Sequence, residues 1–153
     1  KVALTERNNW IKLFAVLLCS TIASYFFTKS PLIDLDKIIG LGDDLHYNLI
    51  STSAIIGGFL FTGVTILISA INNKRVGRLW ENHYLDNLYR AAFVGILADV
   101  ATILSALASL FLHLGKKGTV HIIRIEIITV LIGIIFFAWS CYGLAYILSK
   151  MRK

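Results

Sequence analysis

Asp99 is the residue whose type and setting point most directly to chemistry, because it is the one Asp, Glu, Lys or Arg residue in the apolar stretch 91–114. If that stretch is a helix with a rise of 1.5 Å per residue, Asp99 lies ~12 Å beyond Ala91. A charge at such a depth in a bilayer costs on the order of 2.5–3.5 kcal/mol. The carboxyl group must therefore be neutral, hydrogen-bonded or in contact with water.

Hydroxyl and imidazole side chains continue from Asp99 toward the end of the same stretch. They fall broadly on one side of a helix and form an intramembrane polar path: Asp99, Thr102, Ser105, Ser109 and His113. One interpretation is that the path carries an ion or a proton, or senses a change in the bilayer, since ionisable residues at membrane depth are functional candidates. The alternative is a neutral acid that only fixes helix packing.

The segment 72–90 is the most distinctive polar part of the chain. Its apolar residues fall at helical spacing from Val76 to Leu88, which predicts an amphipathic helix. Residue types that are common at protein interfaces are interleaved with them, and we expect these to bind a cytoplasmic protein partner: Arg75, Arg78, Trp80, Glu81, Tyr84 and Tyr89. A basic turn that only anchors the topology is the alternative interpretation.

Other residues that could do chemistry are sparse, and we expect no enzyme, no cofactor and no metal. The chain has no Walker loop, HExxH motif or CxxC motif. Its cysteines, Cys19 and Cys141, are interpreted as small apolar fillers. Asp43, Asp44 and His46 could offer three ligands to a cation, but a solvated or helix-capping role is the stronger interpretation.

Composition predicts the elements that position these residues. The 153 residues are 57% hydrophobic and 16% charged, with a mean hydropathy of +0.74, whereas soluble domains carry about 25% charged residues. The apolar residues gather in four stretches, each near the length of about 20 residues that crosses a bilayer as a helix: 11–28, 49–71, 91–114 and 127–149. We expect an all-α, polytopic integral membrane protein whose four transmembrane helices form one domain over residues 1–153. Too few residues remain outside the stretches to build a soluble enzyme.

The basic residues set the expected orientation. Of the 15 Lys and Arg residues, most lie in the N-terminal segment, in the segment 72–90 and after residue 149. Because cytoplasmic loops carry the excess of basic residues, we expect both termini and the segment 72–90 in the cytoplasm of a bacterial cell, with the helices in its inner membrane. The formal charge of +6 then indicates contact with anionic lipid, and we expect no direct binding of nucleic acid.

Small residues along the stretch 49–71 predict close helix packing. They step by three or four positions and so share one helical face: Ser51, Ala54, Gly58, Thr62, Thr65 and Ser69. A similar series along the stretch 91–114 suggests that the two helices form a tight hairpin. Spacing leaves two alternatives open, which are packing within one chain and a seam between the copies of a homo-oligomer.

The hairpin pattern has three parts. These are a span rich in small residues, a basic turn, and an aromatic residue before the next span. These parts are Ser53, Gly57, Gly58, Leu67 and Ile68, then Arg75, Arg78, Leu79 and Glu81, then Tyr84 and Leu85. Over residues 53–85 this pattern resembles the small four-span proteins of phage exclusion and phage defence. Among them are the RexB-type exclusion proteins of lambdoid phages and KwaA, the membrane subunit of the Kiwa defence system.

The resemblance implies a membrane subunit of a bacterial anti-phage defence system. In one mechanism, a homo-oligomer in the bilayer senses membrane disturbance and signals to a cytoplasmic partner through the segment 72–90. In a second mechanism, the oligomer is an ion-conducting pore that depolarises the membrane. A small-solute transporter or an assembly factor is a third alternative, unrelated to the resemblance.

Overall fold

The computed structural model describes residues 2–30, 37–38, 40–69, 84–112 and 116–151. Nearly all of them belong to four long helices: α1 (Val2–Lys29), α3 (Asp43–Ser69), α5 (Tyr84–Phe111) and α6 (Lys116–Met151). Each helix holds a segment long and apolar enough to cross a membrane: Trp10–Lys29, Asp43–Ser69, Leu88–Phe111 and Gly118–Tyr146. The prediction of an all-α chain with four candidate membrane-spanning helices is confirmed.

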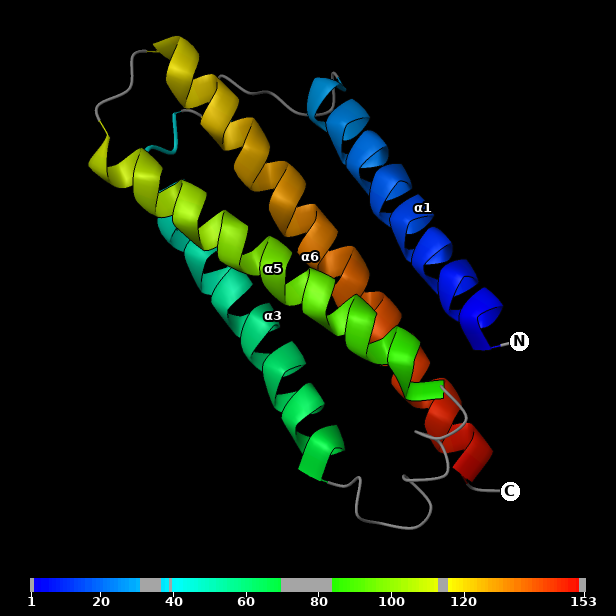
Figure 1. Ribbon diagram of the computed structural model, residues 1–153. Helices are drawn as coiled ribbons and strands as arrows, with labels where there is room; N and C mark the ends of the chain where they lie inside the picture. Colours follow the sequence, from blue (N-terminus) through cyan, green and yellow to red (C-terminus); the bar gives the residue numbers. More distant parts are fainter. Residues whose placement is uncertain (1, 31–36, 39, 70–83, 113–115, 152–153) are drawn as a thin grey trace.

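Helices α5 and α6 form the centre of the bundle and pack along one another (Figure 1). Helix α3 lies against α5, and α1 lies against α6. The helices alternate in direction, so both termini lie at the same end of the bundle (Figure 1). The opposite end holds the start of α3 and the start of α6, and this end positions the site described below.

The outward faces of the helices are apolar. Large side chains that would be buried in a soluble protein are exposed here, including Phe14 on α1, Phe59 on α3, Phe93 on α5 and Tyr142 on α6. Extensive exposed apolar surface marks a protein or membrane interaction site. The arrangement is typical of a multi-pass membrane protein.

Two apolar clusters hold the helices together. The larger one joins α1, α5 and α6 through four buried residues: Leu13, Ala91, Ile132 and Phe136. The smaller one consists of Leu85 and Leu88, against which Leu67 of α3 packs. Near the same end, the guanidinium of Arg90 lies 4.7 Å from the centre of the Trp10 ring, a cation–π contact between α5 and α1.

The start of α3 accounts for the positions of Asp43 and Asp44. Gly42 has a φ of 57°, in the left-handed region that favours glycine, and α3 begins directly after it. Asp43 and Asp44 are exposed in the first turn, where a carboxylate interacts favourably with the helix dipole. Across the part of the chain that the structure describes, no three His, Cys, Asp or Glu side chains gather as a metal site.

All four helices begin before the apolar stretches at 11, 49, 91 and 127, and the difference matters most for α6 and α5. The apolar segment of α6 starts at Gly118 rather than near residue 127, so Arg124 and Glu126 belong to the candidate membrane span. Helix α5 starts at Tyr84, inside the segment 72–90. Burial of Leu85 and Leu88 in the smaller cluster stabilises this first part of α5.

Candidate functional site

A histidine and a glutamate form a buried pair between α3 and α6. Nδ1 of His46 lies 2.8 Å from Oε2 of Glu126, a hydrogen bond between side chains that are 6% and 0% exposed. The proton of this bond resides on either atom, depending on the protonation of the pair. Ser109 of α5 faces the same carboxyl group, whereas Oε1 of Glu126 has no hydrogen-bond partner among the described residues.

The sequence patterns do not predict this pair. Glu126 lies just outside the stretch 127–149, and the sequence marks His46 only as a possible cation ligand beside Asp43 and Asp44. The structure separates them, because His46 is buried against α6 while the two aspartates are exposed. The signal that would have revealed Glu126 is the run of isoleucines on both of its sides, which continues the apolar pattern toward Gly118.

Asp99 is buried where α3, α5 and α6 meet, and it is 1% exposed. A glycine of α6 makes room for it. A Cβ atom at Gly133 would collide with Oδ1 of Asp99, whereas one at Gly57 of α3 would lie in ordinary contact, 3.4 Å from Cβ of Asp99. The absence of a side chain at Gly133 therefore allows a carboxyl group into the interior.

The Asp99 carboxyl group is not compensated by its surroundings. Neither of its oxygens has a hydrogen-bond partner in the described part of the chain. The buried hydroxyl of Ser53 lies near the carboxyl group, but it too lacks a bond of good geometry to any described residue. An ionised carboxylate in this setting would cost several kcal/mol, so the geometry favours the neutral acid.

Two threonines bridge α5 and α6 between these acids. The hydroxyls of Thr102 and Thr129 are 2.8 Å apart. Each also lies within hydrogen-bonding distance of its own helix backbone, at the carbonyls of Ala98 and Ile125 respectively. Because Thr129 follows Glu126 and Thr102 follows Asp99 by one helical turn, the two hydroxyls lie between the two carboxyl groups along the bundle.

These side chains form one polar column inside the bundle, which we define by its members: His46, Ser53, Asp99, Thr102, Ser109, Glu126 and Thr129. The column ends in an apolar layer beyond Asp99. A Cβ atom at Gly95 would lie 2.7 Å from Leu60 and 3.3 Å from Phe136, and both of those side chains are buried. The polar column therefore runs from the starts of α3 and α6 into the bundle and does not traverse it.

Three residues of the predicted polar path, Asp99, Thr102 and Ser109, form the α5 side of this column. Asp99 and Thr102 are fully buried, and Ser109 faces Glu126. Ser105 is half-buried, and its hydroxyl donates a hydrogen bond of 3.0 Å to the carbonyl of Thr102. His113 lies outside the described residues. The residues that the pattern of one helix could not reveal are those contributed by α3 and α6, namely His46, Ser53, Glu126 and Thr129.

The small-residue face of α3 lies on the outside of the bundle. All six of its members are exposed: Ser51, Ala54, Gly58, Thr62, Thr65 and Ser69. Helix α3 packs through a neighbouring face instead, which carries the buried residues His46, Ser53 and Leu60. Within one chain the small residues thus form no helix interface, and a seam between copies stays a prediction.

The predicted partner-binding residues are divided by the start of α5. Arg75, Arg78, Trp80 and Glu81 lie outside the described residues. Tyr84 is the first residue of α5, and Tyr89 packs against Leu85 and Leu88 in the smaller apolar cluster. Tyr89 therefore belongs to the bundle, and its ring is only partly available to a partner.

Comparisons of the chain with models of known protein families, with curated proteins and with solved structures give no match.

Proposed function

We propose that this chain is a sensor subunit of the bacterial inner membrane, with both termini in the cytoplasm, and that the buried His46–Glu126 pair is its sensing element. The observation that carries the proposal is the 2.8 Å hydrogen bond between these two ionisable side chains inside a candidate membrane span. The resemblance to phage-exclusion and phage-defence proteins supports a role in detecting the membrane disturbance that infection causes.

The net charge of the His46–Glu126 pair depends on the number of protons that it holds. While the two groups keep one titratable proton between them, as imidazolium with carboxylate or as imidazole with carboxylic acid, the pair is neutral overall. Loss of that proton leaves a net charge of −1 in the interior, which is unfavourable in a low-dielectric setting. The contact between α3 and α6 is therefore expected to be strongest while the pair holds that single proton and to weaken when the proton is lost.

Two cations of the described residues lie on the helices around the pair. Arg124 lies on α6 two residues before Glu126 and is half-buried. Lys29 lies on α1, with Nζ 4.8 Å from the centre of the Tyr25 ring.

Helix α3 is suited to carry the signal across the membrane. His46 is near its first residue, and its last described residue, Ser69, leads into the segment 72–90. The distribution of basic residues predicts that the start of α3 faces the periplasm. Weakening of the His46–Glu126 contact at that end would then shift α3, whose other end continues into the cytoplasmic segment 72–90. A partner bound at Arg75, Arg78 or Trp80 would register that shift.

A depolarising pore is the second candidate function. The exposed face of α3 favours it, because the hydroxyls of Thr62, Thr65 and Ser69 could line a conduit between copies. The polar column argues against a pore within one chain, since Leu60 and Phe136 close it. We therefore rank the sensor above the pore.

The test combines phage plating with a flux assay. Cells that express the chain with its neighbouring genes should reduce plaque formation, and Glu126→Gln should abolish this reduction at equal protein level. Tyr142→Phe, at an exposed position of α6, is the matched control and should protect fully. Proteoliposomes of the purified protein should hold a proton gradient. Full protection by Glu126→Gln would refute the sensor, and collapse of the gradient would favour the pore.

A further inference from the structure

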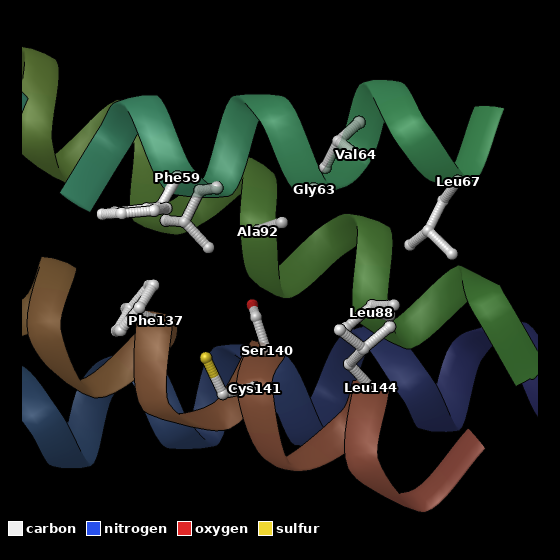
Figure 2. A pocket seen from close by; sticks show the side chains of 11 residues that line it. Phe59, Gly63, Val64, Leu67, Leu88, Ala92, Phe137, Ser140, Cys141 and Leu144 are labelled. Carbon is white, nitrogen blue, oxygen red and sulfur yellow. The ribbon is translucent and has the colours of Figure 1, made fainter. Parts of the chain in front are cut away.

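An apolar groove lies on the flank of the bundle, away from the polar column and nearer the end that holds the termini. Its lining side chains come from α3, α5 and α6 (Figure 2), and the groove opens to the outside of the bundle. Its walls are almost entirely apolar, formed by residues such as Phe59, Leu67, Leu88, Phe137 and Leu144.

One polar group points into this groove. Figure 2 shows the hydroxyl of Ser140 directed from α6 toward α3 and α5. Ser140 is 7% exposed, and its Oγ has no hydrogen-bond partner among the described residues. A serine inside a helix normally bonds to the carbonyl one turn earlier. A buried hydroxyl without a partner is unfavourable, and an acceptor supplied by a ligand would satisfy it.

Gly63 of α3 lines the groove without a side chain, and a Cβ atom at this position would meet no described atom within 4 Å. The rings of Phe59 and Phe137 approach from α3 and α6 at one end of the lining (Figure 2). Leu67, Leu88 and Leu144 form its apolar lining at the other end (Figure 2).

We propose that this groove binds a membrane-soluble molecule of the quinone class, with a flat ring that bears carbonyl oxygens and an apolar tail. The ring occupies the space between Gly63 and Ser140, beside the two phenylalanines. One carbonyl oxygen accepts a hydrogen bond from Oγ of Ser140, and the tail lies along Leu67 and Leu144. A plain acyl chain of bulk lipid fills the apolar walls but leaves the hydroxyl without an acceptor.

Two cysteines supply an internal readout of binding. Both are free and exposed, but Cys141 lines the groove and Cys19 lies on α1. We would incorporate the full chain into nanodiscs of quinone-free phosphatidylcholine and measure alkylation of each cysteine by N-ethylmaleimide, using mass spectrometry. Decylubiquinone should slow alkylation of Cys141 at least about fivefold, with saturation, and leave Cys19 unchanged. Equal slowing at both cysteines, or an effect without saturation, would show only partition into the bilayer and would overturn the proposal.

Two related compounds distinguish the contribution of the ring to binding from that of the carbonyl group. Decylbenzene has a ring without an acceptor, and methyl decanoate has a carbonyl group without a ring. Each should protect Cys141 less well than decylubiquinone. Equal protection by decylbenzene would overturn the hydrogen bond to Ser140, and equal protection by methyl decanoate would overturn the assignment of a ring.

One small-to-large substitution in the groove and one at an exposed position provide a matched pair. Gly63→Leu places a side chain into the groove and should abolish protection, whereas Ala101→Leu, at an exposed position of α5, should leave it intact. Ser140→Ala should weaken binding by about 3- to 10-fold through loss of one hydrogen bond. Undiminished protection in Gly63→Leu, or undiminished affinity in Ser140→Ala, would contradict the proposed site even if the other variant fails to fold.

Discussion

The imidazole of His46 and the carboxyl group of Glu126 are hydrogen-bonded at 2.8 Å in the interior of the bundle, although 80 residues separate them in the chain. The bond ties the start of α3 to the start of α6, two helices that otherwise meet over a limited area. The pair therefore holds the two helix starts together, and its net charge depends on the number of protons that it carries.

Removal of the Glu126 side chain should destabilise the protein. Glu126→Ala leaves the buried imidazole of His46 without its partner and opens a cavity, so we expect a loss of about 1–3 kcal/mol in the free energy of unfolding. Glu126→Gln keeps an acceptor and most of the volume and should lose less. Thermal unfolding in one detergent compares the two variants with the unmodified chain, and a Glu126→Ala melting temperature equal to that of the unmodified chain would contradict the bond.

A methyl group at Gly133 should collide with the Asp99 carboxyl group. Gly133→Ala is expected to cost about 1–3 kcal/mol, the range for overpacking of a filled interior. Gly58→Ala is the control, because its Cβ points into open space and should change stability little.

The collision can be checked by a double substitution. Asp99→Ala removes the group that the new methyl meets, so Gly133→Ala should cost much less in the Asp99→Ala background. Additive losses in this double-mutant cycle would mean that the two residues do not interact.

Replacement of the Asp99 carboxyl group by an amide should change stability little. Asp99→Asn keeps the shape of the side chain, and the carboxyl oxygens make no hydrogen bond to the described residues that the amide would break. We expect a difference below about 1 kcal/mol in the free energy of unfolding at neutral pH. A larger loss would indicate that Asp99 is an ionised carboxylate with compensating partners.

The exposed small-residue face of α3 should lie at the seam of a homo-oligomer. Gly58→Cys in a Cys19→Ser/Cys141→Ser background is expected to give disulfide-linked dimers when native membranes are oxidised, since small residues allow close approach of helices in lipid. Phe93→Cys, at an exposed position of α5, is the matched control and should stay monomeric. Similar yields from both positions would indicate random collision rather than a seam.

Much of the fold could be predicted from the sequence, because helices in a bilayer need long apolar runs and such runs are visible in composition. Asp99 and Thr102 could also be identified, since they share one helix and a spacing pattern shows which residues lie on the same side. The pattern could not show how α3 is rotated. Its small residues predict one packing face, whereas a neighbouring face, with His46, Ser53 and Leu60, is the buried one.

His46 and Glu126 could not be found from the pattern of any single helix. Each looks like the polar end of an apolar run, where charged residues usually meet water or lipid headgroups. Their burial results from pairing, because each satisfies the other and removes the reason for either to stay exposed. Only the packing of α3 against α6 brings the two together.

The central claim is that the His46–Glu126 pair releases α3 from α6 when it loses its proton. Spin labels at Tyr47→Cys on α3 and His121→Cys on α6, both exposed positions, would report the separation of the two helix starts in a Cys19→Ser/Cys141→Ser background. Pulsed electron–electron double resonance in nanodiscs should give a single short distance between the two spin labels at pH 6. At pH 9 the distances should be longer and more broadly distributed. With Glu126→Gln, where loss of a proton creates no net charge, the short distance should persist at both pH values. An unchanged distance in the unmodified pair, or the same lengthening with Glu126→Gln, would contradict the account.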